Sequence, residues 1–202
     1  QAELLKHADM TDKARNFLLL DESAQRVYVA QTGLVGGAFP THKTAMTAVP
    51  GPRELKDGED SISIRFESPE QGGLKLVKTW TIQRGAYDIA VKHEVVNTGN
   101  VAVSPQLYLQ LVRDGNPPPG ESSFYSTFTG PAVYTDAKKY QKVDFKDIEN
   151  GKVDIPRDSP NGYVAMVQHY FATAWLLADG VQRELFTRKV DTNLYSVGML
   201  TS

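Results

Sequence analysis

The sequence predicts an all-β protein built from antiparallel sheets that pack face to face in two layers. Three observations lead to this class. Apolar and polar side chains alternate with a period of two over much of the chain, clusters of Gly, Pro, Asn and Asp separate the alternating stretches, and amphipathic helical patterns are almost absent. We expect about ten or more strands, which is larger than an immunoglobulin-type sandwich of seven to nine strands.

The first half of the chain holds the clearest strand patterns. Strands are expected around residues 17–20 and 26–31, and residues 36–52 form a turn-rich connection because Pro50-Gly51-Pro52 excludes regular structure there. Beyond residue 60, alternation predicts a meander of successive hairpins. Its strands cover residues 61–66, 74–82, 87–95 and 101–112, with Pro105 at an edge or a bulge.

The second half begins with a predicted exposed loop at residues 114–123, because Pro117 to Pro119 have no N–H to donate to a sheet. Residues 135–140 are expected to make one helical turn with Thr135 as its N-cap. The aromatic and β-branched residues of 163–177 favour one long strand there over a helix. The chain then finishes with strands over residues 182–189 and 193–200 around a turn at 191–193.

Composition bounds the functions that the chain can have. Its 202 residues are 41% hydrophobic, which is enough for one stable core, and its formal net charge of −2 makes nucleic acid an unlikely partner. The absence of cysteine removes disulfides, thiolate nucleophiles and Cys-ligated metals. The longest apolar-rich stretch, residues 163–178, is shorter than the roughly 20 residues that a membrane-spanning helix needs.

The histidines and serines form no recognisable catalytic or metal-binding motif, so we nominate no catalytic, cofactor-binding or metal-ligating residue. His93 and His169 are more simply explained as hydrogen-bonded residues of a sheet. A carbohydrate-active enzyme would need one of them to meet a carboxylate in a cleft. The carboxylates considered for that role are Glu94, Asp158 and Glu184, and four aromatic residues that a binding groove could use, Trp80, Tyr87, Tyr170 and Trp175, are expected in the core.

Two long stretches resemble a known family. Residues 128–135 (FTGPAVYT) and 139–148 (KYQKVDFKDI) resemble part of the large periplasmic domain of YidC, the bacterial inner-membrane protein insertase. Residues 162–175 (GYVAMVQHYFATAW) are similar to that family's pattern G-W-V-A-M-x-Q-x-Y-F-x-x-A-W. The chain departs from the pattern with Tyr163 for Trp, His169 for a common Gln, and Leu176-Leu177 where the family often has an aliphatic residue and then Pro. Weaker similarity extends over residues 28–34, 78–80, 84–87 and 95–99.

The resemblance implies a single periplasmic β-supersandwich domain over residues 1–202, similar in fold to galactose mutarotase-like proteins, with few short helical turns and truncated at one or both ends. It implies a non-catalytic accessory domain at the periplasmic face of the bacterial inner membrane that assists membrane protein insertion and folding. Its implied partners are Sec translocon subunits, together with nascent membrane proteins or periplasmic chaperones. Attachment to the membrane would come only from segments absent from this chain, and no cofactor is implied.

Two other functions stay open from the residues alone. One is a carbohydrate- or peptide-binding β-sandwich module, in which an exposed sheet face or edge accepts an extended segment by strand addition. The other, which we favour least, is a mutarotase-like sugar enzyme, since kinship of fold does not transfer catalysis.

Overall fold

The computed structural model describes residues 1–122 and 124–202, and nearly all of its regular structure is β-strand. Antiparallel strand pairs occur in all three sheets, so the predicted all-β, antiparallel class is confirmed. The strands divide into a larger unit, residues 1–32 with 108–202, and a smaller unit, residues 33–107. No helix in these described ranges is long and apolar enough to cross a membrane.

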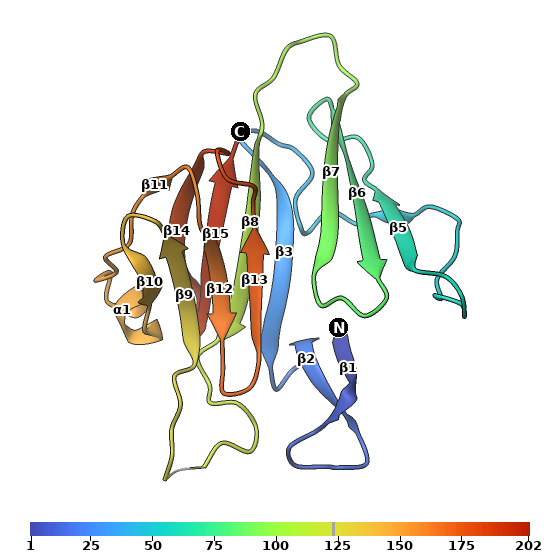
Figure 1. The fold of residues 1–202 in the computed structure, drawn as a ribbon. Coiled ribbons are helices and arrows are strands. Elements are labelled where there is room, and N and C mark those ends of the chain that lie inside the picture. Colours follow the sequence, from blue (N-terminus) through green and yellow to red (C-terminus); the bar gives the residue numbers. More distant parts are fainter. Residues whose placement is uncertain (123) are drawn as a thin grey trace. The chain divides into compact units, whose positions relative to one another are not determined.

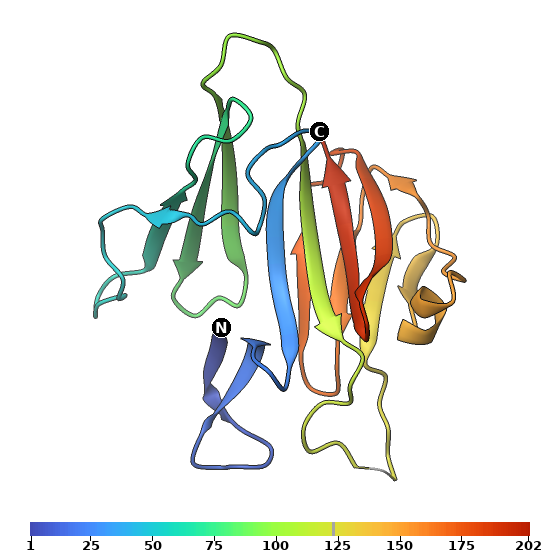
Figure 2. The ribbon, with the colours of Figure 1, turned by 180° about the vertical axis from the view of Figure 1, so that it is seen from behind.

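The larger unit is a sandwich of two sheets (Figure 1). One sheet has seven strands in the order β1-β2-β3-β8-β15-β14-β11, and the other has four in the order β10-β9-β12-β13. Seen from behind in Figure 2, the seven-stranded sheet lies in front of the other. The first sheet contains β1 (Ala2–Ala8), β2 (Asn16–Glu22), β3 (Val27–Val35), β8 (Gln106–Asp114), β11 (Asp158–Ser159), β14 (Arg183–Asp191) and β15 (Leu194–Thr201), and the second contains β9 (Gly130–Thr135), β10 (Lys139–Lys142), β12 (Tyr163–Val167) and β13 (Ala172–Leu176).

Apolar side chains from both sheets fill the space between them. Val197 and Met199 of β15 are completely buried, as are Val133 of β9 and Val164 of β12. Such burial removes about 25 cal/mol of unfavourable hydration for each Å² of apolar surface. Polar groups join the layers as well: the Tyr28 hydroxyl of β3 donates to the Met166 carbonyl of β12 over 3.1 Å.

The smaller unit is a four-stranded meander in the order β4-β5-β6-β7. Its core cluster consists of Leu34, Phe39, Leu74 and Leu76. The strands predicted over residues 61–66, 74–82 and 87–95 are present, the third displaced by two residues, and the expected alternation of burial is clearest in the first of them. The strands are β4 (Thr47–Ala48), β5 (Ser61–Glu67), β6 (Leu74–Gln83) and β7 (Ile89–Asn97).

Two of the predicted strands differ most from the structure. The strand expected over residues 101–112 begins only at Gln106, directly after Pro105, whose missing N–H cannot join a ladder. The long strand expected over residues 163–177 is instead the hairpin β12–β13, reversed at residues 168–171, where the Gln168 N–H donates to the Phe171 carbonyl over 2.9 Å. That reversal contains no Gly or Pro, which explains why the sequence did not reveal it.

The helical content also differs from the prediction. Residues 135–140 form the β9–β10 turn, in which the Thr135 hydroxyl accepts the Lys138 N–H, so Thr135 caps a hairpin turn rather than a helix. The structure's α-helix is α1 (Phe145–Glu149), which packs through Ile148 into a cluster with Tyr195. The expected loop at residues 114–123 has no strand beyond Asp114 as far as residue 122, and residue 123 lies outside the described residues.

Arg183, the first residue of β14, joins the connections around the β12–β13 hairpin. Its side chain is buried, yet the guanidinium bonds to carbonyl oxygens rather than to a carboxylate. Five carbonyls accept from its Nη atoms over 2.6 to 3.3 Å, and they belong to Pro160, Gly162, Leu177, Ala178 and Val181. These residues lie just before β12 and after β13, so one side chain fixes both open ends of the hairpin.

Gly162, whose carbonyl bonds to Arg183, occupies a position where the backbone conformation and the lack of space require glycine. Its φ is +95°, and a Cβ at this position would lie 1.9 Å from the Tyr134 carbonyl oxygen of β9. A side chain would therefore displace β12 from its partner strand.

Replacing Arg183 by Met should destabilise the chain strongly, because five carbonyls lose a charged donor. We expect a loss of about 3 kcal/mol in the free energy of unfolding, and a fall of about 6–12 °C in the thermal midpoint. Urea and thermal unfolding measure both. Arg188→Met, at an exposed position of the same strand, is the matched control and should cost no more than about 0.5 kcal/mol. Equal losses in the two variants would contradict the role given to Arg183.

Candidate functional site

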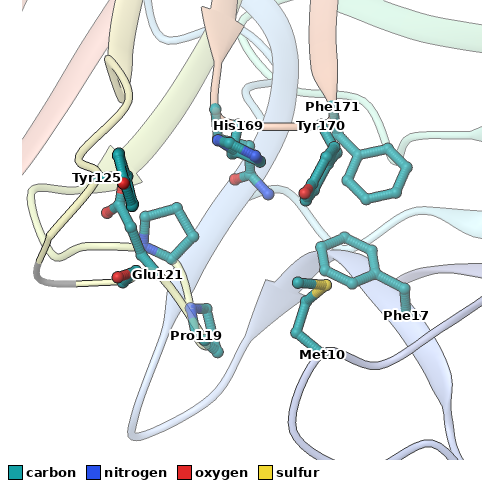
Figure 3. A pocket seen from close by; sticks show the side chains of 12 residues that line it. Met10, Phe17, Pro119, Glu121, Tyr125, His169, Tyr170 and Phe171 are labelled. Carbon is teal, nitrogen blue, oxygen red and sulfur yellow. The ribbon is translucent and has the colours of Figure 1, made fainter.

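The larger unit contains a pocket of about 220 Å³ where three segments meet (Figure 3). The first is the β1–β2 hairpin, which contributes Met10 and Phe17. The second is the β8–β9 loop, which contributes residues 118–122 and Tyr125, and the third is the β12–β13 turn, residues 168–171. The pocket therefore lies at the closed end of the hairpin whose open end Arg183 fixes.

Aromatic rings and a methionine form its apolar wall. The rings of Phe17 and Phe171 stack with their centroids 4.4 Å apart, and His7 meets Phe171 edge-on at 5.4 Å. The loop comes close to the hairpin at Gly120, where a Cβ would stand 2.9 Å from that of Met10. Gly120 also has a φ of +79°, so both space and backbone conformation favour glycine there.

A polar chain of hydrogen bonds joins the loop to the turn. The backbone N–H and the hydroxyl of Thr127 lie 3.0 and 3.3 Å from Glu121 Oε1, and the same hydroxyl lies 2.8 Å from His169 Nδ1. A carboxylate only accepts hydrogen bonds, so the hydroxyl donates to Glu121 and accepts from His169. It follows that the neutral imidazole carries its proton on Nδ1 and presents Nε2 as an acceptor.

Gln168 completes the polar lining. Its side chain is only 8% exposed, and its Oε1 has no hydrogen-bond partner within the part of the chain that the structure describes. The backbone N–H of the same residue closes the β12–β13 turn. Gln168 thus lines the pocket while its amide oxygen stays buried and without a partner among the described residues.

The structure does not bring together the histidine and carboxylate residues that a sugar enzyme would need. His169 lies in the pocket, where the carboxylate that reaches it through Thr127 is Glu121, a residue that the sequence did not single out. Glu184 of β14 is the register partner of Asp158 and forms an ion pair with Arg157 at 3.4 Å, and neither carboxylate lines the pocket. Residues 1–122 and 124–202 contain no group of three His, Asp or Glu side chains that could hold a metal.

In the smaller unit, His93 of β7 is the register partner of Lys78 of β6. Burial lowers the pKa of Lys78 to about 8, and burial together with the Lys78 charge lowers the pKa of His93 to about 4. Glu94, the next residue on β7, forms exposed ion pairs with Arg65 and Lys92 over 3.3 and 3.2 Å. Neighbouring side chains of a strand point to opposite faces, so His93 and Glu94 do not form an acid–base pair.

The prediction that all four aromatic residues lie in the core is wrong for two of them. Tyr87 is 88% exposed and Tyr170 is 66% exposed. Trp175 of β13 is half-buried and donates its indole N–H to the Gln110 carbonyl of β8 over 2.9 Å, and Trp80 is half-buried in β6. Tyr170 instead packs its ring edge-on against His169 at 3.9 Å beside the pocket.

Comparisons with known proteins give one consistent result. The family model described as YidC periplasmic domain matches residues 1–202. A protein of Janthinobacterium sp. (strain Marseille) named Membrane protein insertase YidC is 50% identical over 198 residues, which cover 98% of this chain and 35% of that protein. Proteins with the same name from Herminiimonas arsenicoxydans and Aromatoleum aromaticum are 49% and 46% identical, with 98% of this chain covered and 35% and 36% of theirs. The chain spans about a third of the length of these relatives.

Thr127→Val should release the link between Glu121 and His169. We expect the neutral His169 ring to shift from the Nδ1–H toward the Nε2–H tautomer, with a loss of no more than about 1 kcal/mol in stability because these bonds are exposed. The ¹⁵N chemical shifts of the imidazole report the tautomer. Thr129→Val is the matched control, since the Thr129 hydroxyl has no partner among the described residues and its removal should leave the ring unchanged. A wild-type ring with its proton on Nε2 would refute the assignment.

The lowered pKa values of Lys78 and His93 predict how stability depends on pH. In each case the unfolded chain binds the proton at a higher pH than the folded chain, so stability falls as the pH falls. The fall should run from about 10.5 to 8 for Lys78 and from about 6.5 to 4 for His93. Lys78→Met should abolish the first decline, reduce the second, and stabilise the chain by on the order of 1–3 kcal/mol at pH 7. Urea unfolding across this pH range measures these changes, and a variant less stable than the wild type at pH 7 would contradict the prediction.

Proposed function

The chain belongs to the family of YidC periplasmic domains, and from this membership we propose that it serves as a non-catalytic accessory domain that helps an inner-membrane insertase to insert and fold membrane proteins. The observation that carries the proposal is the extent of the match: the family model spans residues 1–202, and about half of the residues are identical over 98% of the chain in the first relatives. The resemblance inferred from the sequence is thereby confirmed.

The location follows from the family. The relatives are named membrane protein insertases, and the matching region is their periplasmic domain. We therefore place the chain at the periplasmic face of the bacterial inner membrane, held there by segments of the longer protein. This placement is part of the proposal, since the chain accounts for about a third of the relatives' length.

The proposed partners are subunits of the Sec translocon, together with nascent membrane proteins or periplasmic chaperones. Support comes from exposed aromatic side chains on two segments that line the pocket. Phe124 and Tyr125 of the β8–β9 loop are 89% and 81% exposed, and Tyr170 of the β12–β13 turn is 66% exposed. Aromatic residues gathered at one surface are typical of sites that bind other proteins.

Site-specific crosslinking in the full-length insertase tests the partner proposal. A photoreactive phenylalanine in place of Phe124 or Tyr125 should form crosslinks to translocon subunits in intact membranes. The same group at Tyr87, which is 88% exposed in the smaller unit, is the matched control for exposure and should give few or none. Absence of any translocon crosslink from the two loop positions would refute contact through this surface.

A further inference from the structure

We propose that Asn150 is a site of spontaneous covalent modification, in which the Gly151 nitrogen displaces ammonia from the Asn150 side-chain amide and hydrolysis leaves aspartate or isoaspartate. The sequence contains two Asn-Gly pairs, Asn150-Gly151 and Asn161-Gly162, which the residue pattern alone does not distinguish. The structure does distinguish them, because it exposes the first pair and holds the second in hydrogen bonds. The inference concerns the chemistry of the chain itself and does not rest on the proposed function.

The reaction consumes only water. Hydroxide removes the proton of the Gly151 N–H, the nitrogen forms a bond to Cγ of Asn150, and the amide nitrogen of the side chain takes up a proton and leaves as ammonia. Water then opens the five-membered succinimide ring. Attack at Cγ gives aspartate, and attack at the main-chain carbonyl gives isoaspartate, whose backbone has one additional carbon. Glycine favours closure of the ring because no Cβ obstructs its nitrogen.

The surroundings of Asn150 permit this reaction. Asn150 and Gly151 are both exposed in the turn that ends α1. No hydrogen bond engages the Asn150 side chain among residues 1–122 and 124–202. Even a Cβ placed on Gly151 would have no atom within 4 Å, so there is space around the reacting nitrogen. The ψ angle of Asn150 is 0°, and rotation about this bond brings the Gly151 nitrogen toward Cγ.

That rotation breaks few interactions. The Gly151 N–H donates to the Ile148 carbonyl over 3.2 Å, and the Lys152 N–H donates to the Asp147 carbonyl over 2.8 Å. Both bonds belong to the exposed last turn of a five-residue helix. Helix ends open locally at a small cost in free energy, so the reactive geometry is accessible from the folded state.

Asn161, in contrast, is half-buried and bound at both ends of its amide. Its Oδ1 accepts from the Asp136 N–H over 2.9 Å and from the Ser159 hydroxyl over 3.3 Å. Its Nδ2 donates to the Asp136 carboxylate over 3.0 Å. The carbonyl of Gly162 accepts from Arg183, which restrains the backbone on the other side of the reacting nitrogen. Ring closure at Asn161 therefore requires the loss of several hydrogen bonds together.

The product changes the end of α1 in two ways. It adds a carboxylate next to Glu149, whose side chain accepts from Lys189 and Tyr195 over 2.6 and 2.8 Å. Isoaspartate also lengthens the backbone of the turn, so the carbonyls that accept the N–H groups of residues 150–152 no longer match them in position. Both changes weaken the attachment of α1 to the seven-stranded sheet.

The test compares the two Asn-Gly pairs within one molecule. The native chain and the chain unfolded in guanidinium chloride are incubated at a mildly alkaline pH, and peptide mapping by mass spectrometry follows the gain of nearly one mass unit at each asparagine. In the native chain Asn150 should convert at least tenfold faster than Asn161, whereas in the unfolded chain the two rates should be similar. Equal rates in the native chain, or the same preference in both states, would overturn the proposal.

Two variants separate the reaction from its structural control. Asn150→Gln retains an amide but forms the larger six-membered ring slowly, so modification at this position should disappear while the rate at Asn161 stays unchanged. Asp136→Ala removes the carboxylate that holds the Asn161 amide, so Asn161 should convert at least threefold faster while Asn150 keeps its rate. A mass gain at position 150 in Asn150→Gln, or an unchanged rate at Asn161 in Asp136→Ala, would contradict the proposal.

Discussion

The hydrogen bonds of the Arg183 guanidinium hold together the segment before β12, the segment after β13 and the start of β14. A buried cation normally requires an anion beside it, yet here five backbone carbonyls provide the compensating negative dipoles. Those carbonyls can converge only if the chain before β12, the chain after β13 and the start of β14 lie together. The guanidinium thus fixes the open end of a hairpin whose closed end, five residues of strand or about 17 Å away, forms one wall of the pocket.

Sequence patterns predicted the strands whose two faces differ in burial. β5 shows the expected alternation of exposed and less exposed side chains, and Gly-containing turns mark where β5 and β6 reverse, so the meander of β5 to β7 could be predicted. β12 carries no such signal, since its three central residues are all buried and its reversal at residues 168–171 has no turn-forming residue. Its division from β13 is imposed by pairing with β9 on its other side, a contact between distant segments that local pattern does not encode.

The candidate site was even less accessible from sequence. The sequence pattern does not link His169, Tyr170 and the three-proline loop to Met10 and Phe17, which lie over 150 residues before His169 and about 100 residues before the prolines. Only the folded sandwich brings the β1–β2 hairpin to the β12–β13 turn. The resemblance to YidC domains identified the family but did not indicate this pocket. A sequence motif covers one continuous stretch of the chain, whereas the pocket is lined by three separate segments.

Buried polar side chains of the larger unit differ in how their hydrogen-bonding groups are satisfied. Arg26 and Arg113 each leave Nε unpaired in the described structure, but both donate through Nη to backbone carbonyls, so each guanidinium remains anchored. Gln168 differs because its amide oxygen is buried without a partner in the described structure, in a residue that lines the pocket. Natural structures seldom leave such an acceptor without a partner, because an unsatisfied buried acceptor costs about 1–3 kcal/mol, so the β12–β13 turn is stabilised less than the connections that the arginines join.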